Sequence, residues 1–282
     1  MSNAEHCAAL VREHDRDRYL AALFAPTDKR HALLALYAFA VEIGRVRDVA
    51  REPMPGEIRL QWWREVLEGA RDGEAAAHPV AAALREAIAR HGLDAARLVA
   101  FIDAHTFDLY DEPCKTLDDL DNHAVLTEGL LLASAAKVLG QEGFAIDVAT
   151  RHAGIASTIL RIVLALPKHI ARHQLYIPLE VLDRHKVDLQ SVFAGQDSAE
   201  LRAALAELRR HARRQLTAAA MEAGEVPAAI MPALLPLALA GPTLKRMDRR
   251  GYEPFAPEPL SRIRRQWLLW RAARDARRIF AS

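Results

Sequence analysis

A group of positively charged side chains follows a long apolar segment in the middle of the chain. The group comprises Arg161, Lys168, His169 and Arg172. No Asp or Glu occurs in residues 152–179, so no acid nearby in the sequence neutralises these side chains. Cationic side chains hold phosphate and carboxylate groups through charge-assisted hydrogen bonds. The pattern therefore predicts a site for an anion at the end of this segment.

Two further groups of polar residues raise the question of a metal. The acidic group contains Asp108, Asp111, Asp118, Asp119 and Asp121. Carboxylates bind divalent cations, but this spacing matches no known metal loop, so a solvated loop over residues 111–121 is the simpler interpretation. His169 and His173 are four residues apart, yet Pro167 interrupts their helix and no carboxylate supports them. Neither group favours a metal site.

Two adjacent tryptophans, Trp62 and Trp63, lie in the segment RLQWWRE at residues 59–65. Neighbouring side chains diverge by about 100° around a helix, so the two rings cannot point the same way. We expect one ring in the core and the other beside a cavity or a seam between helices.

The last helical segment, Leu260–Phe280, combines arginines with aromatic side chains. Its arginines are Arg262, Arg264, Arg265, Arg271, Arg274, Arg277 and Arg278, and its tryptophans are Trp267 and Trp270. An apolar face could close a helical bundle, whereas arginines interleaved with tryptophans suit an anionic membrane surface. Both interpretations stay open, because arginines on the outer face are compatible with either.

Helix-forming residues dominate the chain, and alternating β-branched runs are missing. Apolar residues at helical spacing predict a long buried helix over residues 147–166, which leads into the cationic group. The other expected helices cover residues 4–24, 28–50, 57–70, 79–90, 94–110, 123–139, 178–185, 198–223, 226–247 and 260–280, and prolines break the one over 226–247. We therefore predict an all-α fold in a single domain over residues 1–282.

Composition narrows the classes of function. The chain has 282 residues, 51% of them hydrophobic, and its net charge of +1 gives no general attraction to nucleic acid. Its two cysteines, Cys7 and Cys114, have no metal-ligand spacing and fit a reducing compartment. No signal peptide or membrane-spanning segment is recognisable, so we expect a cytoplasmic protein. The glycine patterns of phosphate and dinucleotide loops are also missing.

Four blocks in register resemble the squalene/phytoene synthase family. They are Tyr37-Ala38-Phe39, residues 59–65, Gly154-Ile155-Ala156 and Tyr176-Ile177-Pro178. The resemblance extends from about residue 27 to the terminal helix, with further family-like segments at 108–110 and at Glu128-Gly129. It implies a helical bundle of the isoprenoid synthase type with a central cavity. Active members of this family join two prenyl diphosphates head to head, using Mg²⁺ held by two Asp-x-x-x-Asp motifs on facing helices.

The family's motif positions carry few carboxylates in this chain. In the register of the four blocks, these positions are Gly44 and Asp48 in the first motif and Ala165 and His169 in the second. Lys168 stands where the family has a glutamate, and Arg161 stands where it has an asparagine. Only Asp48 remains of four metal-binding carboxylates. The resemblance therefore implies no catalytic residue, no metal site and no cofactor that can be assigned here.

Loss of both motifs is typical of one offshoot of the family. Its representative member is the mitochondrial complex I assembly factor with a squalene/phytoene-synthase-like domain. Residues 41–65 resemble this offshoot more than the active enzymes. Our first hypothesis is a non-catalytic assembly or lipid-handling factor, peripheral at the inner face of a membrane. In it a prenyl or other lipid phosphate would bind Arg45, Arg161, Lys168, His169, Arg172 and Tyr176.

Two alternatives belong to other classes. One is an active Mg²⁺-dependent prenyl diphosphate synthase whose ligands are redistributed to Asp48 with Asp108 or Asp111. The other is a protein-interaction bundle without a ligand. The deciding observation is whether the cations around His169 meet Asp48 at one open cavity.

Overall fold

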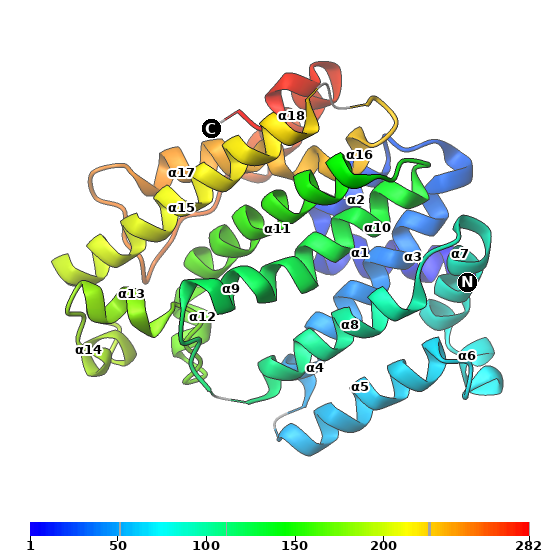
Figure 1. The fold of residues 1–282 in the computed structure, drawn as a ribbon, viewed down its shortest axis with the longest axis horizontal. Helices are drawn as coiled ribbons and strands as arrows, with labels where there is room; N and C mark the ends of the chain where they lie inside the picture. The colour runs from blue at the N-terminus through cyan, green and yellow to red at the C-terminus, as the bar shows by residue number, and fades with distance from the viewer. Residues whose placement is uncertain (51, 111, 225–226, 282) are drawn as a thin grey trace.

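The computed structural model describes residues 1–50, 52–110, 112–224 and 227–281. All regular secondary structure in these ranges is helical, which confirms the predicted all-α class. The two longest helices, α11 (Phe144–Leu164) and α15 (Ala199–Ala223), lie side by side across the molecule (Figure 1). Around them pack shorter helical elements of the C-terminal half.

The N-terminal half contributes one side of the bundle. Its elements are α1 (Asn3–His14), α2 (Arg16–Ala22), α3 (Thr27–Gly44), α4 (Val46–Val49), α5 (Pro53–Leu67), α6 (Asp72–Ala77), α7 (Pro79–His91), α8 (Ala95–Thr106) and the 3₁₀ turn η1 (Phe107–Leu109). The single helix expected over residues 4–24 is wrong. It breaks at Asp15, whose carboxylate accepts a hydrogen bond from the backbone N–H of Arg18 and so caps α2. Pro53 starts α5 earlier than expected because its fixed φ suits the first helical turn.

The C-terminal half adds the two long helices and several short ones. Its elements are α9 (Leu117–Ala124), the π turn η2 (Val125–Gly129), α10 (Leu130–Val138), α11, α12 (Leu166–Ile170), α13 (Leu179–Arg184), α14 (Leu189–Phe193), α15, α16 (Met231–Leu234), η3 (Leu235–Leu239), α17 (Ala240–Met247), α18 (Arg262–Arg274) and η4 (Ala276–Arg278). The acidic loop expected up to residue 121 is wrong from residue 117 onwards. There α9 begins, because Thr116 and Asp119 form a reciprocal capping box. The helix expected over 226–247, with breaks at its prolines, is divided as expected into α16, η3 and α17, and residue 226 lies outside the described ranges.

Two glycines set the distance between α11 and η2. A Cβ atom built on Gly154 would lie 2.5 Å from the backbone nitrogen of Gly129, which is closer than van der Waals contact allows. The bundle therefore needs glycine at residue 154, within one of the four sequence blocks. Helix α11 ends at Leu164, two residues before the expected end, and Pro167 lies in the first turn of α12. This break separates Lys168, His169 and Arg172 from α11, whereas Arg161 stays within that helix.

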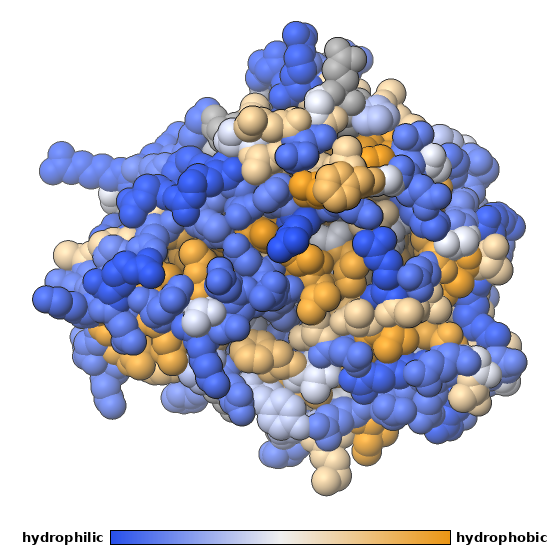
Figure 2. All heavy atoms as spheres, in the orientation of Figure 1, coloured by the Kyte–Doolittle hydropathy of each residue, from blue (hydrophilic) through white to orange (hydrophobic). Residues whose placement is uncertain are grey.

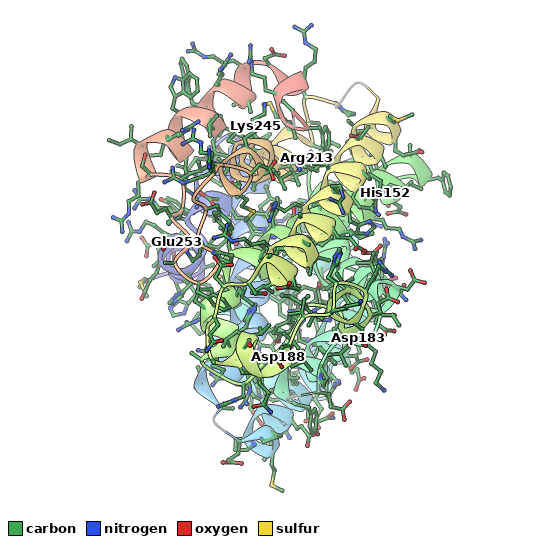
Figure 3. All side chains as sticks on the ribbon, turned by 90° about the vertical axis from the view of Figure 1, so that its left-hand side faces the viewer. His152, Asp183, Asp188, Arg213, Lys245 and Glu253 are labelled. Atoms are coloured by element: carbon green, nitrogen blue, oxygen red, sulfur yellow. The ribbon has the colours of Figure 1, made fainter. Side chains whose placement is uncertain are left out.

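Polar contacts hold α15 over its neighbours. His152 of α11 donates from Nδ1 to Oε1 of Gln215 at 2.5 Å, and Arg213 pairs with Asp248 just after α17. Figure 3 shows α15 crossing obliquely over the bundle and labels Arg213 on α15 and His152 on α11. Hydrophilic side chains cover most of the face in Figure 2, with apolar atoms visible between them. Within the described ranges, no helix combines the length and apolarity needed to cross a bilayer.

Candidate functional site

The carboxylate retained from the first motif is held by two cations. Lys168 Nζ donates to Oδ2 of Asp48 at 3.1 Å, and Arg172 donates to Oδ1 of the same carboxylate. Asp48 lies on the single-turn helix α4, and its partners lie on α12 and just after it. Partial burial raises the pKa of Asp48, but the hydrogen bonds and charges of Arg172 and Lys168 outweigh burial and hold it below 3.8. The carboxylate is therefore ionised and neutralised within the chain.

These residues do not fit the Mg²⁺ cluster that the family uses. Both oxygens of Asp48 already accept hydrogen bonds from cations, and the ammonium group of Lys168 would repel a metal placed there. The second motif offers Ala165 and His169, neither of which is a carboxylate. In the part of the chain that the structure describes, no group of three or more His, Cys, Asp or Glu side chains could hold a metal.

The other position of the first motif, Gly44, lies beside a buried histidine. A Cβ atom built on Gly44 would be 3.9 Å from Nε2 of His105. The other ring nitrogen, Nδ1, lies 2.8 Å from the carbonyl oxygen of Phe101. A carbonyl only accepts, so Nδ1 carries the proton. Burial lowers the pKa of His105, which leaves Nε2 as an unprotonated acceptor near Gly44.

A row of five ring side chains extends from His105 across the bundle. In order these rings are His105, His123, Phe107, Tyr176 and His169, with successive centroids 6.2, 5.9, 6.2 and 4.6 Å apart. We call this set the aromatic row. Burial is the largest of the causes that lower the pKa values of His123 and His169 to about 4. The imidazoles of the row are therefore neutral at physiological pH, and His169 does not act there as a cation.

Tyr176, the fourth ring of the aromatic row, is hydrogen-bonded to Asp108. The Tyr176 hydroxyl donates to Oδ1 of Asp108 at 2.8 Å, and burial together with this carboxylate raises the pKa of Tyr176 well above its usual 10. Asp108, one candidate for a redistributed metal ligand, accepts this hydrogen bond on Oδ1. Asp111, the other candidate, lies outside the described residues. His169 and His173, which the sequence did not favour as a metal pair, have different neighbours: His173 stacks on Phe193, and His169 contacts Tyr176.

Arg161 lies in a different environment, at a cavity of about 380 Å³ between α2, α11, η3, α17 and α18. Its polar lining consists of Asp15, Asp17, Arg18, Glu128, Ser157, Arg161, Thr243 and Arg265, and its apolar lining includes Leu160, Leu164, Leu237 and Leu239. Asp48, Lys168 and Arg172 do not line it. The predicted cations therefore divide into two places rather than meeting at one cavity.

A buried ion pair forms the floor of this cavity. Arg18 donates to the Glu128 carboxylate and, at 2.7 Å, to Asp15. Burial raises the pKa of Glu128, but Arg18 and Arg161 more than compensate, so the net shift is downward. Arg161 itself stands 3.7 Å from Glu128 with 55% of its side chain exposed, so much of its guanidinium faces the cavity.

Most residues of this cavity were not predicted as site residues, among them Arg18, Glu128 and Arg265. Arg265 pairs with Asp17 from the opposite end of the chain. The sequence offered two signals, the family-like segment at Glu128-Gly129 and an arginine, Arg18, directly before the apolar residues 19–22. Arg45, which was predicted, contacts His14 at 2.8 Å and does not pair with Asp48.

The prediction for the two tryptophans is confirmed. Trp63 is buried and packs edge-on against Phe39, with ring centroids 5.2 Å apart. Trp62 is partly buried, donates from Nε1 to Glu74 at 2.7 Å, and lines a surface cavity of about 700 Å³ with Arg64 and Arg71.

Known proteins resemble this chain over most of its length. In sequence, complex I assembly factor 6 of Mus musculus is 29% identical over 252 residues, which cover 89% of this chain and 76% of the relative. The same protein of Homo sapiens is 28% identical over the same shares. A 15-cis-phytoene synthase from Synechocystis is 23% identical over 203 residues, which cover 68% of this chain and 60% of that enzyme.

Solved structures share the fold. The squalene synthase of Alicyclobacillus acidocaldarius superposes with a TM-score of 0.79 at 21% identity, covering 90% of this chain and 95% of that one. A dehydrosqualene synthase gives a TM-score of 0.80 at 16% identity, with 95% and 94% coverage. These matches confirm the predicted isoprenoid synthase type of fold. The family model described as squalene/phytoene synthase matches residues 11–271, and the chain therefore belongs to the squalene/phytoene synthase family.

Proposed function

We propose that this chain is a member of the family that does not join prenyl diphosphates and that acts as an assembly factor for respiratory complex I. One observation carries the proposal. The retained carboxylate, Asp48, is neutralised by Lys168 and Arg172, so the place of the catalytic metals is taken by side chains of the protein itself. Without Mg²⁺ the chain lacks the means by which active family members assist departure of diphosphate.

The relatives support the same function. Four mammalian complex I assembly factors match 89% of the chain at 27–29% identity, and the Drosophila homolog matches 68% of it at 26%. The phytoene synthases match 68% of it at 23–24%. The chain thus shares more with proteins named for assembly than with proteins named for synthesis. The proposed partners are components of complex I. Such a role implies that the protein lies at the periphery of the membrane that holds the complex.

The cavity at Arg161 is the proposed ligand site, and a prenyl or other lipid phosphate is its proposed ligand. Arg161 faces the cavity and is only loosely paired with Glu128 at 3.7 Å, so its guanidinium is free to bind phosphate oxygens. Leucines 160, 164, 237 and 239 supply an apolar wall for a hydrocarbon chain. No cofactor takes part, because arginine replaces the metal as counter-charge.

An assay with farnesyl or geranylgeranyl diphosphate and Mg²⁺ tests the loss of catalysis. We expect no diphosphate release above a heat-inactivated control. Release above that control would support the alternative, a synthase with redistributed ligands, and would reject the proposal.

Farnesyl diphosphate binding in the presence of EDTA tests the ligand site. Arg161→Ala should weaken binding roughly tenfold or more, the value of a charge-assisted hydrogen bond. Arg59→Ala is the matched control, since Arg59 is exposed on α5, away from this cavity. Binding that needs Mg²⁺, or that both variants weaken equally, would reject a metal-free site at Arg161.

Deletion of the gene in the organism that encodes it tests the assembly role. We expect less fully assembled complex I on native gels and lower NADH:ubiquinone oxidoreductase activity, both restored by the wild-type chain. Restoration by Asp48→Asn as well is expected, because no metal chemistry is needed. Unchanged complex I in the deletion strain would reject the role.

A further inference from the structure

The outer face of α18 carries an apolar stripe that the described part of the chain leaves uncovered. Its members are Ile263, Trp267 and Trp270, which are 81%, 49% and 46% exposed. Residues spaced by four and three positions lie on one face of a helix. Two indole rings and an isoleucine thus project together from a single surface of the molecule.

The opposite face of α18 fixes the helix to the bundle. Leu269 and Ala272 are buried, and Arg265 forms two hydrogen bonds with Asp17 of α2. Figure 1 shows α18 at one edge of the molecule, and Figure 3 shows side chains extending outward from it. The inner face therefore docks the helix on the bundle, as one of the two interpretations of the sequence proposed. The outer face is held in a defined orientation toward solvent.

Arginines flank the stripe, and most of them lack acidic partners among the residues that the structure describes. Helix α18 contains Arg262, Arg264, Arg265, Arg271 and Arg274 and no Asp or Glu. Of these only Arg265 forms a salt bridge within the described residues. The guanidinium carbons of Arg271 and Arg274 instead lie 5.0 and 3.7 Å from the ring centroids of Trp267 and Trp270. By contrast, Arg209 and Arg213 on α15 both pair with Asp248.

We propose that this face of α18 is a peripheral membrane-binding surface for an anionic lipid bilayer. Indole rings settle at the level of lipid headgroups, and guanidinium groups above them bind phosphate oxygens. The helix of 13 residues is about 20 Å long and would lie in the plane of the interface. Four arginines without acidic partners supply the charge complementarity that selects anionic over neutral lipid.

Vesicle co-sedimentation of the full chain tests the proposal. We expect binding to phosphatidylcholine vesicles that contain phosphatidylglycerol, little binding to phosphatidylcholine alone, and release by high salt. Arg264→Gln/Arg271→Gln/Arg274→Gln should lower the partition coefficient roughly fivefold for each charge removed. Trp267→Ala/Trp270→Ala should lower it while leaving the charge unchanged.

Matched controls separate this surface from general charge and apolarity. Arg59→Gln/Arg151→Gln/Arg210→Gln removes three exposed arginines from α5, α11 and α15, and Met54→Ala/Ile58→Ala removes two exposed apolar side chains from α5. Both controls should bind as the wild type does. Equal recovery with and without anionic lipid, or an equal loss in the arginine control, would overturn the proposal.

Circular dichroism checks that every variant is folded, which is expected because none of the substituted residues is buried. An acidic protein as the true partner would appear as no vesicle binding at all, which also overturns the proposal. This surface is separate from the cavity at Arg161. Failure in the vesicle assay would therefore leave the diphosphate and complex I tests unaffected.

Discussion

Lys168 and Asp48, 120 residues apart in sequence, form an ion pair with 3.1 Å between Nζ and Oδ2. Arg172 occupies the other oxygen of the carboxylate. In a protein that binds Mg²⁺ at this place, the ammonium group would oppose the metal. Here the same geometry joins α4 to α12, and the remaining aspartate of the motif becomes a structural contact.

Asp48→Asn should lower the free energy of unfolding at neutral pH by about 1 kcal/mol or less, because the pair is partly exposed. The pKa of Asp48 is lowered by folding, so its contribution is present above the unfolded value of 3.8 and is lost as the pH falls through the folded value. Urea unfolding of both proteins from about pH 6 to about pH 3 should show their difference shrinking toward zero. A difference that stays constant with pH would contradict this role.

His123 should make the protein sensitive to mild acid. Burial lowers its pKa from 6.5 to about 4, so between these values the unfolded chain binds a proton that the folded chain does not. Stability therefore falls as the pH drops through this range, by up to roughly 3 kcal/mol from this residue. His123→Phe keeps a ring against Phe107 and should flatten the pH dependence of the unfolding free energy.

The measurement is urea unfolding of wild type and His123→Phe at about pH 7 and about pH 5. The wild type should lose more stability over this range than the variant, although His169 contributes a similar term to both. Parallel losses in the two proteins would show that His123 is not buried in its neutral form.

Glu128 should matter for stability through its buried pairing with Arg18. Glu128→Leu leaves the Arg18 guanidinium buried with Asp15 as its remaining partner, which should cost about 3 kcal/mol in denaturant unfolding. The double variant Arg18→Met/Glu128→Leu replaces both charges by apolar groups and should recover most of that loss. A double variant as unstable as the sum of both single variants would contradict this account.

Gly154→Ala should destabilise the bundle by about 1–3 kcal/mol, since the added methyl group meets the backbone of Gly129, which cannot rotate aside. Gly73→Ala is the matched control, because nothing lies within 4 Å of its Cβ position in α6. The control should be neutral or stabilising by up to about 1 kcal/mol. Thermal unfolding compares the two, and equal melting temperatures would argue against the close approach of α11 and η2.

The family and the all-α class were predictable from local sequence. Apolar periodicity places most helices, and four short blocks in register place the motif positions. The amino-acid sequence alone therefore reveals that carboxylates are missing at Gly44, Ala165 and His169. Each of these signals depends on neighbouring residues or on the order of blocks. The order and spacing of residues along the chain are therefore enough to predict most helices and the motif positions.

Only the tertiary structure decided how the charges are partnered. The cations near Lys168 formed one group in sequence, but α12 turns Lys168 and Arg172 toward Asp48 while Arg161 remains on α11 at a separate cavity. His169 counted as a cation in sequence, and its burial in the aromatic row makes it neutral. Charge and its partners depend on contacts across 100 residues or more, such as Arg18 with Glu128, and on desolvation, which no local pattern records.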